Sequence, residues 1–512
     1  MRVYFTNLGC KLNQAENDSL ARDFLAAGHQ LAPSLAEADL HVVNSCTVTA
    51  AAARSSRQAA RAAARAASTH AHAPRTVLTG CYATASPAEA AGLPGIDLVV
   101  ANRDKERLLE HVHRAFGGAA TPEPSAPASK ATAPKPEPSA PTPEAIAPTP
   151  EPFAPKPEPS APTPEPSAPP AAGQPHGPHA GRLPYGNTRA LIKVEDGCDM
   201  RCAFCIIPAT RGRQRSRPLA ALVEEVRRLV LAGHREVVVT GVQISAWRAP
   251  RAPGEAGRRD LRLADLVRAL LAVLPPAAGT PAPPSPAANA PAPPLPAPPA
   301  PASPATAARL RLTSIAPWEL DDELLALWAD RRLCRHLHLS LQSGAGATLR
   351  RMRRPYTPAT YARLVERVRA AIPGVAVTTD VIVGFPGETA AEHEESLATV
   401  AALGFAKVHV FPYSPRPGTA AATLPGAVPP PEQRRRMAGM LAAAAQAERD
   451  FHAAHLGRRE TVLWERPRDG RGQGLTDNYI RVFSPAGAGL WNRLGEVELL
   501  SLAPGGMLGR VL

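Results

Sequence analysis

Three cysteines lie close together near the middle of the chain. Cys198, Cys202 and Cys205 form a Cys-x3-Cys-x2-Cys arrangement. Three thiolates on one loop can bind three irons of a 4Fe-4S cluster and leave the fourth iron with an open position. Such an iron can chelate the amino and carboxylate groups of S-adenosylmethionine, whose reductive cleavage yields a 5′-deoxyadenosyl radical. The alternative is a structural zinc site, but zinc sites more often add a second Cys or His pair, and none lies nearby.

Three further cysteines are widely separated in the first part of the chain. Cys10, Cys46 and Cys81 each fall just beyond one of the first three short apolar runs. If those runs are parallel strands, their carboxyl ends share one edge of a sheet, which is where open α/β sheets bind ligands. We therefore expect the three thiols to meet there and to hold a second three-cysteine cluster. The alternative is that they are small buried hydrophobic side chains.

The last cysteine stands alone. Cys334 has no cysteine or metal-spaced partner in the surrounding sequence. We expect it to be a core or surface thiol and not a ligand.

A run of arginines follows the Cys198 loop directly. A basic run is usually a solvated face, but beside a proposed site in a basic protein it could hold the phosphates of RNA. The candidate phosphate ligands are Arg211, Arg213, Arg215 and Arg217.

Three stretches that end predicted strands offer contacts to a cofactor. Residues 380–388 are rich in glycine, which lets backbone approach a ligand closely. Residues 239–241 and 341–344 are weaker signals of the same kind, and an ordinary strand-to-helix turn is the alternative for all three. The candidate contacts to S-adenosylmethionine in them are Thr240, Gly241, Gln342 and Asp380.

The segments that must position these residues begin with an alternation of strands and helices over residues 1–116. This pattern predicts an α/β domain with a small parallel sheet and covering helices. The predicted strands are residues 2–5, 40–43, 76–78 and 98–100, and the main predicted helices are residues 14–27 and 47–67.

The alternation resumes over residues 184–446 and predicts a full or partial parallel barrel of about six strand–helix units. A long Ala-rich helix is predicted at 431–456. In the last region, residues 447–512, short alternating runs at 461–464, 479–483 and 497–502 predict a small β-barrel. The predicted strands of the parallel barrel are 190–194, 236–240, 310–313, 336–341, 375–383 and 407–411, and its helices are 220–231, 263–274, 319–328, 361–371 and 392–403.

Two Pro/Ala-rich stretches, 117–183 and 275–308, contain almost none of the large apolar side chains that a core needs. The first contains one ten-residue sequence twice, at 135–144 and 156–165, and this is typical of a semi-rigid spacer. A binding role is the alternative. The second stretch interrupts a connection within the barrel and is expected to loop out at the surface.

The composition is basic. The 512 residues include 58 Lys and Arg against 45 Asp and Glu, which suits RNA or an anionic membrane surface, although a genome bias toward arginine is the alternative. No stretch resembles a signal peptide or reaches the ~18 apolar residues of a membrane span. We expect a soluble, cytoplasmic protein, in which seven cysteines favour metal binding over disulfides.

With these residues in view, the chain closely resembles the radical methylthiotransferases over nearly everything outside the two Pro-rich stretches. In that family three N-terminal cysteines stand in Gly-Cys, Asn-x-Cys and Gly-Cys contexts, as Cys10, Cys46 and Cys81 do. A radical S-adenosylmethionine barrel follows, and then a small RNA-binding β-domain called TRAM. The resemblance implies two 4Fe-4S clusters and S-adenosylmethionine as cofactors, with no catalytic residues beyond the cluster ligands.

The residues after Cys10 indicate a substrate branch. Lys11, Asn13 and Gln14 are similar to the Gly-Cys-Lys-x-Asn-Gln form of the enzymes that act on N6-threonylcarbamoyladenosine in tRNA, at position 37 beside the anticodon. The resemblance implies that one S-adenosylmethionine methylates sulfide on the N-terminal cluster and a second yields the radical that attacks C2 of the adenine. It implies tRNA as partner, an electron donor and a sulfur donor of unknown identity, and a monomer.

Other functions remain as alternatives. The same chemistry could act on isopentenyladenosine in tRNA or on a ribosomal protein, or the chain could be a catalytically silent RNA-binding protein. Two positions also depart from the family pattern. Ala316 replaces a glutamate in a stretch where Ser314 is the implied contact to S-adenosylmethionine, and Gln243 stands where another polar residue is expected.

Overall fold

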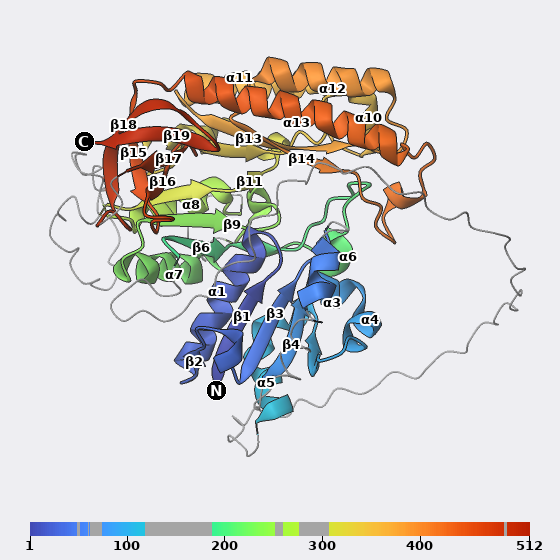
Figure 1. Ribbon diagram of the computed structural model, residues 1–512, viewed down its shortest axis with the longest axis vertical. Helices are drawn as coiled ribbons and strands as arrows, with labels where there is room; N and C mark the ends of the chain where they lie inside the picture. Colours follow the sequence, from blue (N-terminus) through green and yellow to red (C-terminus); the bar gives the residue numbers. More distant parts are fainter. Residues whose placement is uncertain are drawn as a thin grey trace, which may run out of the picture.

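The computed structural model describes residues 1–48, 52–59, 61, 74–117, 187–250, 260–275, 307–485 and 489–512. Figure 1 shows an N-terminal domain in blue, a larger strand–helix body in green to orange, and a small barrel in red beside it. The two predicted Pro/Ala-rich stretches lie almost entirely outside the described residues. So does much of the predicted helix 47–67, of which 52–59 are helical.

The N-terminal domain is built on a parallel sheet with the strand order β2-β1-β3-β4-β5. Leu40 and Val42 of β3 and Val77 of β4 pack with Phe24 of α1 to form its core. The predicted parallel sheet is thus confirmed. Its elements are β1 Arg2–Asn7, α1 Lys11–Ala26, β2 Gln30–Leu31, β3 Leu40–Ser45, β4 Arg75–Gly80, α3 Cys81–Ala85, α4 Pro87–Ala91, β5 Leu98–Val100, η2 Asn102–Arg107 and α5 Leu108–Phe116.

The central domain is a partial parallel barrel. Strands β6, β9 and β10 form one sheet and β11 to β14 form another, and Thr313 alone separates β10 from β11. Six strand runs therefore follow one another in sequence order among the described residues, as predicted. The strands are β6 Arg189–Lys193, β9 Glu236–Thr240, β10 Arg309–Leu312, β11 Ser314–Ile315, β12 His336–Leu339, β13 Ala376–Val383 and β14 Lys407–Pro412.

Helices cover the outer face of this barrel, and Figure 1 shows α11, α12 and α13 along one side. Shorter elements connect these helices to the strands, and some of them carry the candidate site. The helices and short elements of the domain are β7 Glu195–Asp196, α6 Ile207–Arg211, β8 Arg215–Ser216, α7 Leu219–Leu231, η3 Ile244–Ala246, α8 Leu263–Ala272, η5 Pro317–Glu319, α9 Asp322–Leu325, η6 Ala326–Ala329, α10 Gly346–Arg351, α11 Pro358–Ala371, α12 Ala390–Leu403, η7 Ala420–Thr423 and α13 Pro430–Ala453.

The inner face of β12 is polar, whereas that of β6 and β9 is apolar where α1 packs on it. In β12, Leu337 and Leu339 pack with the covering helices, so His336 and His338 face the other side. Helix α1 lies against the inner face of β6 and β9, because Ala15 packs on Leu191 and Val238, which alternate with the residues of the outer core. The N-terminal domain therefore closes one side of the barrel.

The C-terminal region is a closed barrel of the strand order β15-β16-β17-β19-β18, as predicted. Buried Arg309 and Arg311 of β10 donate hydrogen bonds to the carbonyls of Leu475 at 2.8 Å and Thr476 at 2.9 Å, and these bonds attach it to the central domain. The strands are β15 Arg459–Trp464, β16 Gly472–Thr476, β17 Arg481–Ser484, β18 Leu494–Ala503 and β19 Gly506–Val511.

Most observed boundaries lie within a few residues of the predicted ones, and two elements differ in a way that has a clear physical cause. The predicted helix 319–328 is broken into η5, α9 and η6, because the Asp321 carboxylate accepts the Leu324 amide at 2.9 Å and starts a new turn. The predicted strand 479–483 begins later, at Arg481, because Tyr479 has φ +68° and ends a turn. No helix within the described ranges has the length and apolar composition to cross a membrane.

Candidate active site

The Cys198 loop runs from β7 to α6, and β7 pairs with β8 beyond the helix. The Cys198 amide donates to the Gly212 carbonyl at 3.1 Å, and the Cys205 amide donates to the Cys202 carbonyl at 3.2 Å. These hydrogen bonds fold the loop back on itself. The three thiols therefore belong to one compact turn.

Arg354 lies beside this loop. Its Nη1 donates to the Cys202 sulfur at 3.2 Å, and its guanidinium lies 4.9 Å from the ring centre of Trp318 and 5.2 Å from that of Tyr356. The two rings hold the guanidinium through cation–π contacts. Sequence reasoning missed Arg354 because it is 152 residues from Cys202 and has no local signal.

Two thiols of this loop have raised pKa values. Burial raises the pKa of Cys205 to about 12 and also raises that of Cys198. Bound iron takes thiolates, so metal binding must release these protons. Three thiols on one turn, with a guanidinium to balance the charge of thiolates, make a donor set that suits an iron–sulfur cluster.

Thr240 ends β9, and Gly241 follows it beside Glu195. A Cβ at Gly241 would stand 2.3 Å from the Glu195 Oε1, so only glycine lets this carboxylate approach. The Gln243 amide donates to the same oxygen at 2.5 Å, which makes Gln243 part of the turn. Burial raises the pKa of Glu195 to about 7. Sequence reasoning missed Glu195, although it lies three residues before Cys198.

Ser314 is half-buried in β11, which follows β10, the neighbour of β9, after a single residue. Ala316, where the family pattern has glutamate, is buried, and its amide donates to the Ser245 Oγ at 3.1 Å. This hydrogen bond ties the turn after β11 to η3, which follows Thr240 and Gly241. The carboxyl ends of β9 and β11 are thus held together.

Gln342 and Asp380 are joined by backbone hydrogen bonds. The Gln342 amide donates to the Asp380 carbonyl at 2.8 Å, and Gln342 has φ +66°, an uncommon conformation for a residue with a side chain. The Asp380 carboxylate accepts from His338 Nε2 at 3.1 Å and from Ser340 Oγ at 3.2 Å. Burial works to raise the pKa of Asp380, but the hydrogen bond and charge of His338 outweigh it and lower the pKa.

The three N-terminal cysteines follow neighbouring strands, as predicted. Cys10 caps α1 after β1, Cys46 follows β3, and Cys81 begins α3 directly after β4. Burial raises the pKa of Cys46 to about 11, and the charges of Cys81 and Cys10 act in the same direction. Gly80 has φ +101°, and a Cβ there would lie 2.3 Å from the Ser45 carbonyl oxygen.

Polar side chains reach these thiols. Asn102 Nδ2 donates to the Cys81 sulfur at 3.6 Å, and the Cys10 thiol donates to Asn13 Oδ1 at 3.8 Å. No three Cys, His, Asp or Glu side chains within the described ranges are grouped as for one metal ion. A cubane takes each thiolate on a different iron, so its ligands stand farther apart than those of a single ion.

Known proteins match this chain over nearly its whole length. Residues 192–400 match the Radical SAM superfamily and residues 2–101 match uncharacterized protein family UPF0004. A tRNA-2-methylthio-N(6)-dimethylallyladenosine synthase of Erythrobacter litoralis is 30% identical over 509 residues, which are 99% of this chain and 96% of the relative. The chain belongs to the radical SAM methylthiotransferase family.

Relatives from two branches are about equally similar to this methylthiotransferase. The threonylcarbamoyladenosine tRNA methylthiotransferase MtaB of Bacillus subtilis is 29% identical over 97% of this chain and 93% of its own. The protein of the same name from Thermotoga maritima is 30% identical over 83% of this chain and 78% of its own. The degree of identity therefore does not separate the branches.

The cofactors of this methylthiotransferase are S-adenosylmethionine and two 4Fe-4S clusters, as predicted. The described residues fit them, with one set of thiols beside Arg354 and the other beside Asn102. Cys334 belongs to neither set. It is fully buried, as expected of a core thiol.

One predicted RNA contact is wrong. Arg211 is 3% exposed and donates to Glu16, Asn13 and Asp196, so its guanidinium is not available to a phosphate. The other arginines of the basic run differ in their exposure to solvent. Arg213 and Arg215 are exposed, whereas Arg217 is half-buried, pairs with Glu225 at 2.8 Å and donates to the Lys193 carbonyl.

Two of the residues after Cys10 that indicate the substrate branch, Lys11 and Asn13, differ in their exposure to solvent. Asn13 is 1% exposed, donates to the Ser45 carbonyl at 3.0 Å and accepts from Arg211 at 2.8 Å. Lys11 is exposed, and its Nζ donates to the Tyr479 hydroxyl of the C-terminal barrel at 3.3 Å. Of these two residues, only Lys11 is accessible to a substrate.

Proposed function

We propose that this methylthiotransferase acts on tRNA and converts N6-threonylcarbamoyladenosine beside the anticodon to its 2-methylthio derivative. The clusters and S-adenosylmethionine supply the sulfur, the methyl group and the radical, and the chain's own residues hold them in register. One cluster is held by Cys198, Cys202 and Cys205, the other by Cys10, Cys46 and Cys81, and the contacts to S-adenosylmethionine are Thr240, Gly241, Ser314, Gln342 and Asp380.

The nearness of the two cysteine sets carries this proposal. Asn102 Nδ2 donates both to the Cys81 sulfur at 3.6 Å and to the Thr210 carbonyl at 2.9 Å, and Thr210 lies in the helix that follows Cys205. A sulfur donor and a radical generator must reach the same carbon atom. Side-by-side sites supply that proximity without motion of whole domains.

A positive charge beside Cys10 supports the choice of substrate. Lys11 is exposed, and among the described residues no carboxylate lies within ion-pair distance of it. The threonylcarbamoyl substituent carries a carboxylate, whereas the dimethylallyl substituent carries no charge. A cation at this place favours the acidic substituent.

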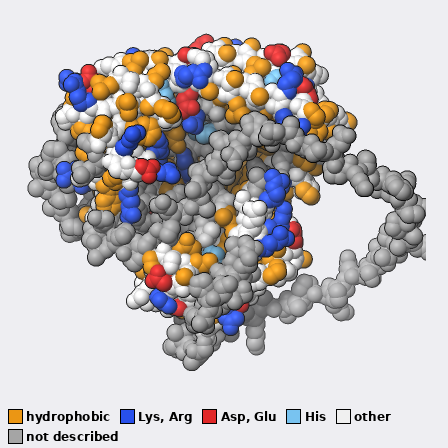
Figure 2. Space-filling model, viewed as in Figure 1, with side chains coloured by type: hydrophobic (Ala, Val, Ile, Leu, Met, Phe, Trp, Pro, Cys, Tyr) orange, Lys and Arg blue, Asp and Glu red, His pale blue; other side chains and the backbone are white. Residues whose placement is uncertain are grey.

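The basic surface supports an RNA substrate. The formal net charge is +13, and Figure 2 shows Lys and Arg side chains on both sides of the hollow between the N-terminal domain and the rest of the molecule. Arg213 and Arg215 are exposed beside the Cys198 loop. Phosphate contacts there would bring the target nucleotide to the cysteine sets.

Mass spectrometry of tRNA nucleosides from a deletion strain tests the substrate. We expect 2-methylthio-N6-threonylcarbamoyladenosine to disappear and its unmodified precursor to accumulate, with recovery on complementation. Loss of the methylthio derivative of isopentenyladenosine instead, with the threonylcarbamoyl product unchanged, would replace this substrate by the other.

Anaerobic reconstitution separates the enzyme from a silent RNA-binding protein. We expect about eight irons per chain, falling to about four when Cys198, Cys202 and Cys205 are all replaced by alanine. Replacement of Cys334, which lies outside both sets, leaves the iron content unchanged. One zinc and no iron would contradict the proposal.

A further inference from the structure

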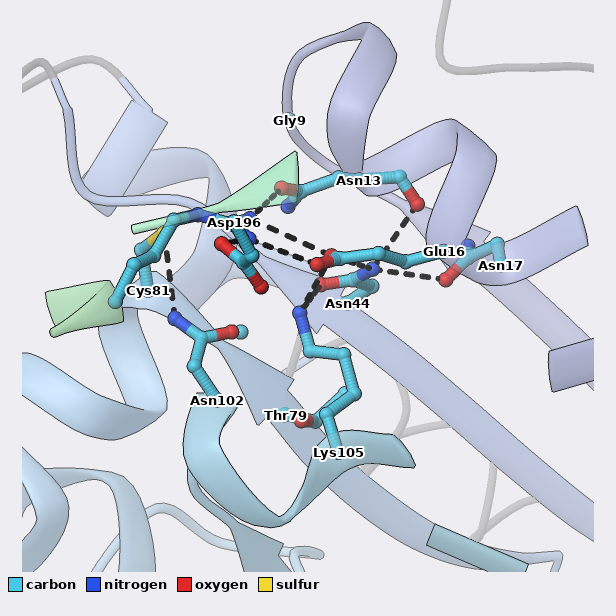
Figure 3. Close-up of polar contacts among 12 residues, drawn as sticks. Gly9, Asn13, Glu16, Asn17, Asn44, Thr79, Cys81, Asn102, Lys105 and Asp196 are labelled. Carbon is cyan, nitrogen blue, oxygen red and sulfur yellow. Dashed lines mark hydrogen bonds and ion pairs between the residues drawn. The ribbon is translucent and has the colours of Figure 1, made fainter. Parts of the chain in front are cut away.

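A buried polar network joins the N-terminal domain to the Cys198 loop, and Figure 3 shows it between α1, η2 and the strands on either side. We call it the interdomain network. The exposed fraction is 4% for Glu16, 3% for Arg211 and 2% for Lys105, so the charges lie out of water. Its members are Asn13, Glu16, Asn44, Lys105, Asp196 and Arg211.

Arg211 is the member that crosses between the domains. Its Nη1 donates to Glu16 Oε1 at 2.7 Å and to Asp196 Oδ1 at 3.0 Å, and its Nη2 donates to Asn13 Oδ1 at 2.8 Å. Burial works to lower the pKa of Arg211, but Glu16 and the other anions nearby hold it well above its ordinary value. The guanidinium is therefore charged, and both of its Nη atoms donate to the network.

Lys105 completes the network from the other side. Its Nζ donates to Glu16 Oε2 at 2.7 Å and to Asn44 Oδ1 at 3.1 Å, so Glu16 is shared between Lys105 and Arg211. The desolvation of such charges offsets most of their attraction, and well-packed apolar residues would stabilise the interface as well. Directional contacts, in contrast, fix the orientation of the groups that they join.

The members of the network lie next to the cysteines in sequence. Asn13 follows Cys10 by three residues and Asn44 precedes Cys46 by two. On the other side, Asp196 precedes Cys198 by two residues and Arg211 ends the helix that follows Cys205. A displacement of one cysteine loop against the other would break these short hydrogen bonds.

Asn102 makes a second, independent link. It is 5% exposed, and its Nδ2 joins the Cys81 sulfur to the Thr210 carbonyl, directly before Arg211. Its Oδ1 is buried and has no hydrogen-bond partner among the described residues. A buried amide that leaves its own oxygen unsatisfied is costly, which indicates that the position of its nitrogen is what matters.

We propose that Arg211 and Asn102 are positioning residues that hold the N-terminal cysteine set at a fixed separation and orientation to the Cys198 loop. The inference rests on the proposed two-cluster chemistry but not on the identity of the methylthiolated nucleoside. When the two cysteine sets are held in a fixed arrangement, each 5′-deoxyadenosyl radical that forms leads to sulfur insertion. Without it, S-adenosylmethionine is cleaved and methyl groups are transferred, but the two half-reactions no longer meet at one carbon.

The test compares coupling in the reconstituted full-length enzyme. In Arg211→Gln and Asn102→Ala we expect the methylthio product formed per 5′-deoxyadenosine to fall at least about tenfold, while iron stays at about eight per chain and the rate of 5′-deoxyadenosine release stays within about twofold of the parent. Arg211→Lys keeps the charge and should recover part of the coupling. Arg103→Ala is the control, since Arg103 adjoins Asn102 but its side chain is 83% exposed.

A spectroscopic measurement gives a readout apart from turnover. The magnetic interaction between the two reduced clusters depends on their separation, so we expect a weaker and more heterogeneous interaction in Arg211→Gln and Asn102→Ala than in Arg103→Ala. An unchanged coupling ratio and an unchanged interaction would overturn the proposal. So would a parallel loss of iron, product and 5′-deoxyadenosine in both variants, which marks a role in folding alone.

The positioning role of Arg211 and Asn102 and the choice of substrate can fail separately. If the parent enzyme methylthiolates another nucleoside, the substrate assignment fails, and the coupling ratio is measured on that product. If the parent holds a single cluster, both fail, and the iron analysis reports it before any variant is made.

Discussion

At the scale of single residues, Gly80 sets where Cys81 lies. A Cβ at this position would meet the Ser45 carbonyl oxygen at 2.3 Å and the Ser45 amide nitrogen at 2.6 Å. We expect Gly80→Ala to push the ends of β3 and β4 apart and to lower bound iron from about eight to about four per chain after anaerobic reconstitution.

Gly28→Ala is the matched control for this change. Gly28 has φ +83°, similar to the +101° of Gly80, but no atom lies within 4 Å of a Cβ built there. The control therefore bears only the backbone strain of about 1–2 kcal/mol and keeps its iron. Equal iron in the two variants would show that the close approach at Gly80 does not matter.

Arg354 is expected to tune the cluster at the Cys198 loop. A hydrogen bond and a positive charge at the Cys202 sulfur favour the reduced state. In Arg354→Gln we expect a more negative midpoint potential, measured by a redox titration followed by electron paramagnetic resonance. The exposed Arg350 on α10 supplies the control Arg350→Gln, which removes the same charge without touching a thiol. An unchanged potential in Arg354→Gln would rule this role out.

Site residues could be predicted from the sequence where their partners lie close in the chain, and could not where the partners are distant in sequence. Cys198, Cys202 and Cys205 share one short motif, so their spacing alone indicates a shared ligand. Arg211 has its decisive partner, Glu16, 195 residues away, and a basic run carries no trace of that contact. It was therefore predicted to bind RNA.

At the scale of elements, the strand ends were predictable. A cysteine within three residues of the end of each of β1, β3 and β4 must lie near one edge, because parallel neighbours present their carboxyl ends together. Helix α1 also held an unused signal. Leu12, Glu16, Leu20 and Phe24 repeat every four residues and are all buried, so a charge stands in the apolar stripe of the helix.

The starts of β9 and β10 carry a second buried ion cluster. Glu236 is fully buried and accepts from Arg309 at 2.6 Å and from Arg311 at 2.7 Å. We expect Glu236→Gln to lower the free energy of unfolding by about 3 kcal/mol, because two arginines then lose their buried partner. Denaturant titration measures the free energy of unfolding. Arg510→Ala, which breaks an exposed pair with Glu498, is the control, and we expect it to lower that free energy by less than about 1 kcal/mol.

The pH dependence of this cluster has a definite sign. Burial works to raise the pKa of Glu236, but Arg311 and Arg309 outweigh it and hold the pKa well below its ordinary value. Its contribution is therefore complete above the ordinary glutamate pKa and is lost as pH falls below it. The difference between Glu236→Gln and the parent should shrink at acid pH, and a constant difference would contradict the ionised pair.

At the scale of the whole molecule, the order of the three domains was predictable but their docking was not. Composition separates the Pro/Ala-rich stretches from the folded parts, and periodicity separates the parallel domains from the β-barrel. The contacts between domains use single polar side chains, such as Arg309 and Lys11, whose partners lie more than 150 residues away. Such pairs leave no periodic signal in one sequence.

Tyr479 reports this docking directly. Its ring stacks on His336 of the central barrel at 4.3 Å between centroids, and its hydroxyl accepts from Lys11 of the N-terminal domain at 3.3 Å. Burial works to raise its pKa, but the charges of Lys11, Arg189 and Arg311 outweigh burial and lower the pKa to about 8. The other tyrosines with a resolved shift all have raised pKa values: Tyr4, Tyr82, Tyr356, Tyr361 and Tyr413.

We therefore expect one tyrosine to ionise near pH 8 in an ultraviolet titration, well before the rest. Tyr479→Phe should abolish this step, and Lys11→Met should move it toward the ordinary value near 10 because the nearest positive charge is gone. Since the folded pKa lies below the unfolded one, the parent should gain stability over Tyr479→Phe as pH rises from about 8 to about 10. A step that stays in place in Lys11→Met would mean that, in solution, the N-terminal domain does not bring Lys11 to the C-terminal barrel.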